Sequence, residues 1–199
     1  MKIIETQYKG YLFRSRLEAR WAVFFDECGV NWEYEPEGYV LDNGQWYLPD
    51  FLLHDVDGRV NGDLYVEVKG QMTEEDAKKI NAFSGIRLVE EKNMSYYTID
   101  NPILVIGNIP SGETMEEIDS YCQDVGYTGF PDIKGGPYPF NFQNIDGDYF
   151  VAHLGVNKAG RFELFGDEGS YLNARDSNST YLAFIKARTA RFEHRRTHI

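Results

Sequence analysis

The chain has 199 residues and a formal net charge of −12, from 20 Lys and Arg against 32 Asp and Glu. Its hydrophobic content of 42% is sufficient for a packed core. No apolar run approaches the roughly 18 residues of a membrane span, and Met1–Thr6 lacks the apolar core of a secretion signal. We therefore expect a soluble, cytoplasmic protein without a membrane partner. The acidic charge opposes non-specific attraction to nucleic acid, which depends on Lys and Arg displacing counterions.

The first predicted element is a helix from Ser15 to about Cys28. Ser-Arg-Leu-Glu fits a capping box, in which the Ser15 hydroxyl accepts from an early helical N–H and Glu18 reaches back. Gly29 supplies the left-handed stop. Apolar residues recur at three- and four-residue spacing, so one face should pack on a sheet. This stripe consists of Leu17, Trp21, Phe24, Phe25 and Cys28.

Short strands joined by tight turns are expected next, and antiparallel pairing is the simplest topology. Asp42-Asn43-Gly44 is a strong turn signal, and a polar turn is predicted over Asp55–Gly58. The predicted strands are Trp32–Glu35, Tyr39–Leu41, Gln45–Pro49, Asp50–Leu53 and Leu64–Lys69.

A second helix is predicted to begin at Thr73–Asp76 and to continue through Ala77–Phe83. The apolar run Ile103–Ile106 then predicts a buried strand. We interpret the main elements as helix, three strands, helix and strand, ending near Ile109.

Beyond this point the sequence is less regular. Pro110–Gln143 is rich in Gly, Pro, Tyr and Asp, and we expect an irregular insertion with a short helix around Met115–Cys122. A second hairpin, Tyr149–Val156 with Arg161–Phe165, and a terminal helix from Thr180 to about His194 complete the prediction.

Candidate chemistry lies on the strand that contains Glu67. Side chains alternate across a strand, so Tyr65, Glu67 and Lys69 share one face while Leu64, Val66 and Val68 share the other. A hairpin from Phe51 to Leu64 would bring the carboxylate of Asp50 beside Glu67 and Lys69. The bland alternative is a solvent-side Glu–Lys pair and an ordinary Pro-Asp turn.

Two close carboxylates repel each other unless a cation lies between them, and Mg²⁺ or Mn²⁺ suits such an all-oxygen site. A metal there would lower the pKa of its water and stabilise charge on a phosphate, while Lys69 would orient the nucleophile and assist proton removal. Glu18 lies at the border of the apolar stripe and should point towards the sheet edge, where it could join the site.

These residues carry a resemblance to the PD-(D/E)XK nuclease superfamily, specifically to uncharacterised nuclease-like proteins common in phage genomes. The resemblance covers about residues 3 to 110. It implies that Asp50, Glu67 and the Val68 carbonyl are metal ligands, that Lys69 is the catalytic lysine and that Glu18 is a helix-borne acid. The matching segments are Tyr8–Trp21, Trp32–Pro36, Tyr47–Phe51 and Val66–Gly70.

The expected fold class follows: α/β, with a restriction-endonuclease-like αβββαβ core, a mixed sheet flanked by helices, and an added C-terminal β-hairpin and helix. Residues 1–110 would form the nuclease core, and residues 111–199 would pack on the same domain.

Contacts to nucleic acid are predicted at basic residues near the two ends of the chain and after the Glu-X-Lys strand. The terminal arginines follow helical spacing and could form a track for a nucleic-acid backbone, although a salt-bridged or solvated surface explains such residues equally well. These residues are Arg14, Arg16, Arg20, Gln71, Arg188, Arg191 and Arg195.

The sequence thus predicts a Mg²⁺- or Mn²⁺-dependent nuclease, a DNA endonuclease of phage or mobile-element origin acting in a bacterial host. One alternative is an RNA-directed nuclease, because the metal chemistry attacks either backbone. Another is a non-catalytic interaction protein that binds a host factor or nucleic acid, which the acidic charge would suit. Double-strand cleavage by one site usually requires two protomers, so a homodimer is also an option.

Overall fold

The computed structural model describes residues 5–58, 62–85, 87–91, 94–98, 100–118, 140–143, 149–151, 153–165 and 174–192. The helices are α1 (Arg16–Glu27), α2 (Glu74–Ser84) and α5 (Ser177–Thr189), with a helical turn over 115–118. The strands are β1 (Thr6–Tyr8), β2 (Tyr11–Phe13), β3 (Trp32–Tyr34), β4 (Tyr39–Val40), β5 (Trp46–Tyr47), β6 (Phe51–Gly58), β7 (Gly62–Val68), β8 (Arg87–Glu91), β9 (Met94–Thr98), β10 (Ile103–Ile106), β11 (Phe140–Gln143), β12 (Tyr149–Val151), β13 (His153–Val156) and β14 (Phe162–Phe165).

The described residues form a mixed α/β fold around one 8-stranded sheet, with strand order β12-β11-β10-β7-β6-β14-β13 and β3 paired to β6. Two pairs, β7 with β10 and β6 with β14, are parallel, and the others are antiparallel. The sheet is therefore mixed, as the sequence predicted. Strands from the second half of the chain extend the sheet at both ends. The hairpin predicted over Tyr149–Val156 and Arg161–Phe165 is formed by β13 and β14, and it belongs to the same sheet as β6 and β7.

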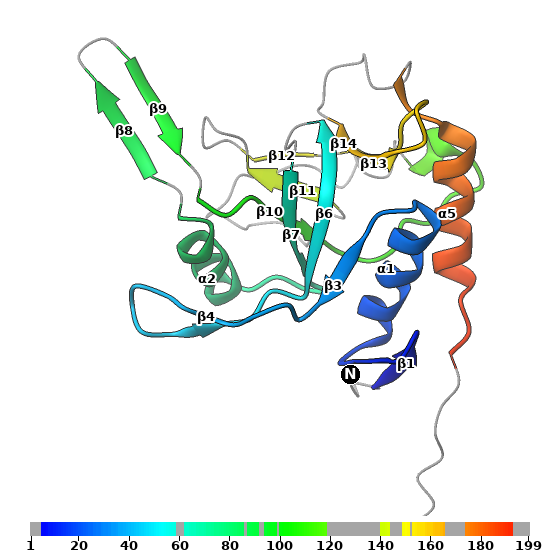
Figure 1. Cartoon of the computed structure of the whole chain (residues 1–199), viewed down its shortest axis with the longest axis horizontal. Helices are drawn as coiled ribbons and strands as arrows, with labels where there is room; N and C mark the ends of the chain where they lie inside the picture. The colour runs from blue at the N-terminus through cyan, green and yellow to red at the C-terminus, as the bar shows by residue number, and fades with distance from the viewer. Residues whose placement is uncertain are drawn as a thin grey trace, which may run out of the picture.

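Two apolar cores cover the two faces of the sheet. Alternate residues of β10 enter different cores, Leu104 and Ile106 on the side of α1 and α5, and Ile103 and Val105 on the side of α2. Figure 1 shows α1 and α5 next to each other, with α2 on the opposite side of the central strands. A strand buried on both faces needs an apolar run rather than alternation, which explains the sequence of β10.

The two ends of helix α1 are determined by its own sequence. Its N-cap is Ser15, whose side chain accepts from the N–H of Glu18, and Gly29 follows the helix with a φ of 70°. The predicted stripe faces the larger core, where the rings of Phe24 and Phe184 stack at 4.4 Å and so join α1 to α5. The buried Trp21 indole N–H donates to the carbonyl of Gly107 at 2.8 Å, which ties α1 to the end of β10.

The second core lies under α2 and the β4–β5 hairpin. The capping box of α2 is present, with the Thr73 and Asp76 side chains bonded reciprocally to each other's backbone N–H. In the hairpin, Gly44 has the positive φ of 79° that the turn signal predicted. Tyr47 and Phe83 pack at 4.8 Å, so hairpin and helix together cover the face of β7 that carries Glu67.

Several predicted boundaries are wrong for identifiable reasons. Asp55–Gly58 is the end of β6 rather than a turn: a register shift between Leu53 and Val56 keeps the strand paired, and β14 pairs with its last residues. The polar Asp57 is held there by an ion pair of 2.8 Å with Arg161. The run Tyr149–Val156 is divided between β12 and β13, which pair with different neighbours.

The terminal helix also differs from the prediction. It is capped by Asp176, whose carboxylate accepts from the N–H of Ser179, and it ends at Thr189 rather than near His194. Most of the predicted irregular insertion lies outside the described residues. Among the helices that the structure describes, none is long and apolar enough to cross a membrane.

Candidate active site

Asp50 is placed by the register of the central hairpin. Phe51 pairs with Val66 across β6 and β7, so Asp50, one residue earlier, lies level with Glu67. Its side chain is almost fully buried, with Oδ2 accepting from the backbone N–H of Val68 at 2.7 Å and Oδ1 paired with Arg14 Nη2 at 2.5 Å. The Pro-Asp carboxylate is thereby fixed directly on the strand that carries Glu-X-Lys.

Glu67 and Lys69 share one face of this strand, as side-chain alternation predicted. Glu67 is 4% exposed, and its two oxygens have different partners: Lys69 Nζ lies 2.7 Å from Oε1, and the Tyr47 hydroxyl donates to Oε2 at 2.7 Å. Lys69 also pairs with Asp76 at 3.3 Å. The predicted polar face is therefore covered by α2 and the β4–β5 hairpin rather than open to solvent.

Glu18 reaches the same region from α1. It is 7% exposed, and its Oε2 accepts from the Tyr34 hydroxyl at 2.6 Å and from the N–H of Arg14 at 3.2 Å. The Ser15 hydroxyl donates to its Oε1 at 2.6 Å. Glu18 therefore reaches back to the Ser15 hydroxyl and the Arg14 N–H, and it links the start of α1 to β3.

Burial and neighbouring carboxylates dominate the electrostatics of Asp50. Its pKa is raised well above the ordinary value, first by burial and then by the negative charges of Glu67 and Glu18; the Val68 N–H and Arg14 oppose this without cancelling it. Burial has the largest single influence on Lys69 and would lower its pKa, but the charge and hydrogen bond of Glu67, together with the charges of Asp76 and Asp50, outweigh it, and the pKa is raised. Lys69 therefore remains an ammonium at neutral pH, while Asp50 is costly to ionise.

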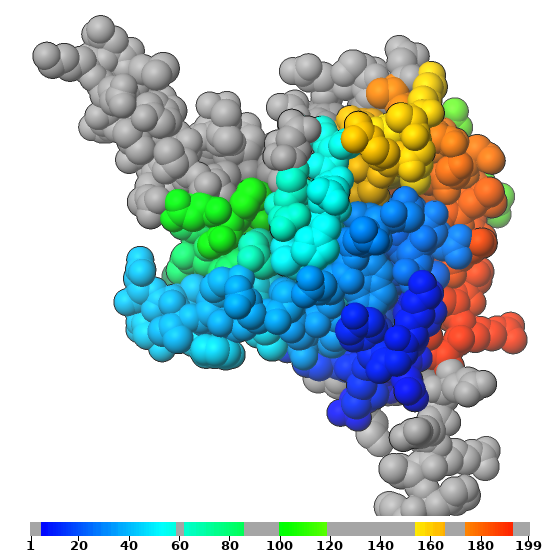
Figure 2. All heavy atoms as spheres, viewed as in Figure 1, coloured from blue at the N-terminus to red at the C-terminus, as the bar shows by residue number. Residues whose placement is uncertain are grey.

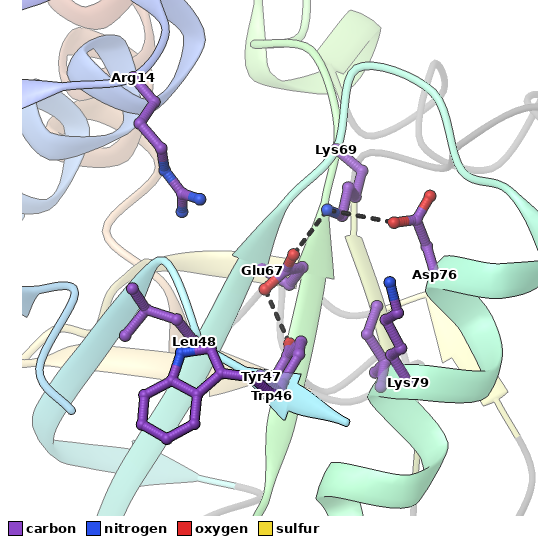
Figure 3. A pocket seen from close by; sticks show the side chains of 9 residues that line it. Arg14, Trp46, Tyr47, Leu48, Glu67, Lys69, Asp76 and Lys79 are labelled. Carbon is purple, nitrogen blue, oxygen red and sulfur yellow. Dashed lines mark hydrogen bonds and ion pairs between the residues drawn. The ribbon is translucent and has the colours of Figure 1, made fainter. Parts of the chain in front are cut away.

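A pocket of about 310 Å³ opens onto Glu67 and Lys69, whereas Asp50 and Glu18 are not among the described residues that line it. Figure 3 shows Glu67 between Arg14 on one side and Asp76 and Lys79 of α2 on the other, with Trp46 at the front. Three cationic side chains thus line a pocket whose floor holds a buried carboxylate. Such a pocket can accept a phosphate group.

Sequence reasoning missed several of these residues. The sequence places Asp76 and Lys79 in a predicted helix without a role in the site, yet the short connection after Lys69 returns the first turns of α2 to the end of β7. Trp46 and Tyr47 are predicted in a hairpin strand, also without a role in the site. The available signal was the alternation of side chains in β5. It places Tyr47 against Glu67 and leaves Trp46 64% exposed on the other face.

The predicted metal ligands lie near one another, but their side chains do not form a metal-binding group. Asp50, Glu67 and Glu18 are close enough to influence one another's charge, yet within the described ranges no three or more His, Cys, Asp or Glu side chains are grouped so as to hold a metal ion. Val68 contributes its N–H, through the hydrogen bond to Asp50. The carboxylates are instead satisfied by Arg14, Lys69 and the two tyrosines.

The predicted nucleic-acid contacts divide among different places. Arg14 lines the pocket beside Glu67 and Lys69. Gln71 is an exposed residue in the connection between β7 and α2. Arg188 donates to the carbonyl of Gly112 at 3.0 Å. The proposed arginine track is wrong in its geometry, because α5 ends at Thr189 and Arg191 follows it without helical spacing. Arg195 lies outside the described residues.

Arg16 and Arg20 do not line the site pocket. Together with Arg191 they line a second one between α1 and the segment after α5.

Comparison with known proteins adds no relative. No family model matches the chain, and neither the curated proteins nor the solved structures contain a significant match. The chemical identity of the site must therefore be argued from its own residues, a buried Asp50 bonded to the backbone between Glu67 and Lys69, with Arg14 and Glu18 beside it.

Proposed function

We propose that this protein is a metal-dependent nuclease that hydrolyses phosphodiester bonds of DNA as an endonuclease. The observation that carries the proposal is the hydrogen bond of 2.7 Å from the Val68 N–H to Asp50. It brings the Pro-Asp carboxylate from 18 residues away to the Glu-X-Lys strand, whose Glu67 and Lys69 line a pocket together with the cations Arg14 and Lys79. A random pair of such motifs would have no reason to converge below a polar pocket.

The architecture is also consistent with a restriction-endonuclease-like core. When the separate hairpins β4–β5 and β8–β9 are set aside, the elements α1, β3, β6, β7, α2 and β10 follow the order αβββαβ, and β10 is parallel to β7 and adjacent to it. The finer assignment to the PD-(D/E)XK superfamily, with phage or mobile-element origin, remains part of the proposal. Its support is this element order together with the matching segments of sequence.

The donor set suits a divalent cation. Asp50 and Glu67 are buried carboxylates with a mutual electrostatic cost, and an all-oxygen environment is what Mg²⁺ or Mn²⁺ prefers. Asp50, Glu67 and the Val68 carbonyl would hold the ion, with Glu18 beside them. When bound, it would lower the pKa of water and stabilise charge on the phosphate. Arg14 and Lys69 now neutralise the two acids, so binding requires these cations to turn towards substrate.

The other groups have roles that follow from their charge. Lys69, with its raised pKa, acts as a hydrogen-bond donor that orients the attacking water or a phosphate oxygen. Arg14 can donate two parallel hydrogen bonds to one phosphate, and Lys79 can contact the next. Water attacks phosphorus, one P–O ester bond breaks, and the products are a phosphate monoester and a hydroxyl. The proton of the attacking water passes to bulk solvent, because both oxygens of Asp50 are already engaged by the Val68 N–H and by Arg14.

A cleavage assay tests the proposal. The protein is incubated with linear, supercoiled and single-stranded DNA and with RNA, in Mg²⁺ or Mn²⁺, beside Asp50→Ala and Lys69→Ala. We expect each substitution to lower the rate by about 100-fold or more. The control Lys158→Ala, at an exposed turn, should match the wild type. Equal activity in all four proteins would defeat the site assignment. Cleavage of RNA alone would make the protein an RNA-directed nuclease.

A non-catalytic interaction protein is the second candidate, and one observation favours it. Both oxygens of Glu67, of Glu18 and of Asp50 already have protein donors. A satisfied site of this kind can serve as a scaffold, and the net charge of −12 suits a protein partner. Millimolar Mg²⁺ separates the two, because ligand binding to the native state raises the melting temperature. A rise that Asp50→Ala abolishes supports the nuclease, and no rise supports the scaffold.

A further inference from the structure

The outer face of the β4–β5 hairpin carries two exposed apolar side chains. Val40 and Trp46 are cross-strand partners and are 70% and 64% exposed, whereas Tyr39 and Tyr47, the other registered pair, face the second core. Figure 2 shows the hairpin, in light blue, projecting from the body of the molecule at the left. Apolar residues scattered singly on a surface need no explanation, but a registered pair beside a polar pocket is a candidate contact surface.

Trp46 also lines the pocket that contains Glu67 and Lys69, and its ring is held in place there. An added Cβ at Gly38 would come within 2.0 Å of the ring, so the indole lies directly against the backbone and only glycine fits beneath it. Because the ring already has one orientation, a flat group that stacks on it costs little further conformational entropy. Trp46 is therefore a rigid aromatic platform at the pocket.

Cationic side chains lie beside this platform. Figure 3 shows Arg14 and Lys79 on opposite sides of Glu67, with Trp46 in front. Arg14 is 54% exposed and Lys79 is 32% exposed, and the partner of Lys79, Glu75, is itself 71% exposed. A surface ion pair of this kind contributes little free energy, so a phosphate can replace Glu75. The two acidic residues that line the pocket are both already paired with a lysine.

An aromatic platform beside cations suits a nucleotide whose base is unpaired. Every base has a flat face that can stack on an indole, and the phosphate next to it needs a cation. In a duplex both faces of a base are covered by the adjacent base pairs. Only a single strand, or an unpaired segment of a longer molecule, can therefore use the platform.

We infer that Trp46 stacks on an unpaired base of a nucleic-acid strand whose flanking phosphates contact Lys79 and Arg14. Val40 extends the apolar surface beside the indole. The inference rests on the proposed function, because it takes this pocket as the site of the nuclease. It gives that nuclease a substrate class, which is single-stranded or locally unpaired nucleic acid.

Equilibrium binding tests the inference without cleavage. Full-length protein in EDTA is titrated into a fluorescein-labelled oligothymidylate, and in parallel into an abasic strand of equal length that keeps the phosphates and lacks the bases. We expect the wild type to bind the oligothymidylate about 10-fold more tightly than the abasic strand. Trp46→Ala should abolish this preference, and Trp46→Phe should retain most of it. The control Leu182→Ala, at an exposed apolar residue of α5, should leave it unchanged.

Two further measurements separate stacking from charge and from a loosened hairpin. Lys79→Gln should weaken the binding of both strands by the same factor and lower the salt slope by about 1, because it removes a phosphate contact. Trp21 is fully buried and Trp32 is half-buried, so Trp46 is the tryptophan most open to a base. Oligothymidylate should quench the tryptophan fluorescence of the wild type, and Trp46→Phe should remove this quenching.

The outcomes distinguish this inference from the proposed hydrolysis. Equal affinity of the wild type for the two strands, or a base preference that survives in Trp46→Ala, overturns the inference even if the protein cleaves DNA. Binding that depends on Trp46 in a protein that cleaves nothing with Mg²⁺ or Mn²⁺ removes the hydrolysis and leaves the inference standing. If the wild type binds neither strand, the inference is wrong, and Val40 and Trp46 are then assigned to a protein partner.

Discussion

The Asp50 carboxylate accepts a hydrogen bond from the Val68 N–H at 2.7 Å, so an acid that precedes one strand is bound to the backbone of the next. Val68 lies between Glu67 and Lys69, whose side chains point to the other face of β7 from its own. This contact joins the Pro-Asp segment to the strand of Glu67 and Lys69. It also keeps the Asp50 carboxyl group in a buried position where its ionisation costs free energy, and this cost can be measured through the stability of the protein.

Asp50→Asn should stabilise the protein at neutral pH. Burial and the charges of Glu67 and Glu18 raise the pKa of Asp50, so between the ordinary value of 3.8 and the folded pKa the folded state retains a proton that the unfolded chain releases. Stability therefore falls as pH rises through this window and stays lower above it. Asn keeps an acceptor for the Val68 N–H but has no charge. We expect a gain on the order of 1 kcal/mol at pH 8 in EDTA, shrinking towards pH 4.

Melting curves from pH 4 to pH 8 check this, with exposed Asp42→Asn as the control. Asp42 lies in the β4–β5 turn, so its substitution should leave the pH profile of the wild type unchanged. An Asp50→Asn protein less stable than the wild type at pH 8 would contradict the assignment of electrostatic strain to Asp50.

Lys69→Met should destabilise the protein by about 1–3 kcal/mol, because it leaves the buried Glu67 with Tyr47 as its remaining partner. Glu67→Gln in the same chain removes the unpaired charge and should recover part of the loss. Urea denaturation of the two single variants and the double variant gives the coupling energy. Lys78→Met breaks an exposed pair with Glu74 and should change stability little. Additive effects of the Glu67 and Lys69 substitutions would mean that their 2.7 Å contact is not an energetic pair.

Trp46→Ala should change substrate binding rather than stability. The ring is 64% exposed at the pocket, and one side of it covers Gly38, where an added Cβ would come within 2.0 Å of the ring. If the proposed nuclease acts on strands with unpaired bases, a base can stack on the exposed side, which is worth about 1–3 kcal/mol. We expect KM for single-stranded DNA to rise about 10-fold with kcat unchanged, and Trp46→Phe to restore it. An unchanged KM in Trp46→Ala would exclude the ring from substrate binding.

Gly155→Ala tests the packing of α5 against the sheet. A Cβ at this position of β13 would lie 2.5 Å from Thr180 Oγ1, the atom that accepts from the Val156 N–H at 3.0 Å. We expect a loss of about 1–3 kcal/mol from overpacking, measured by urea denaturation. Gly62→Ala is the matched control, because a Cβ there meets nothing within 4 Å. Equal stability of the two variants would show that α5 does not pack as closely as described.

Local features were predictable because each depends on a few neighbouring residues. Ser15 and Thr73 cap their helices, Gly44 closes the hairpin turn, and alternation alone places Glu67 and Lys69 on one face. These features follow from hydrogen bonds and steric limits within one or two turns of chain. They gave the positions of α1, α2 and β7 and the face of β7 on which Glu67 and Lys69 lie.

Predicted element boundaries were wrong where contacts with a distant part of the chain determine the structure. Asp55–Gly58 reads as a turn, yet pairing with β14, more than 100 residues later, keeps Asp57 and Gly58 in a strand. The terminal helix is present as predicted, but its end is at Thr189 rather than near His194, and the segment after it, with Arg191, lies against α1.

The sequence by itself determined which side chains carry the candidate chemistry and which strand face holds two of them, because alternation and capping are local. Only the tertiary structure decided that Asp50 bonds to Val68, that Arg14 neutralises it, and that Tyr47 and α2 bury Glu67. These contacts depend on strand register and on what covers each face of the sheet. Both are set by burying apolar surface over the whole chain, which no short stretch of sequence encodes.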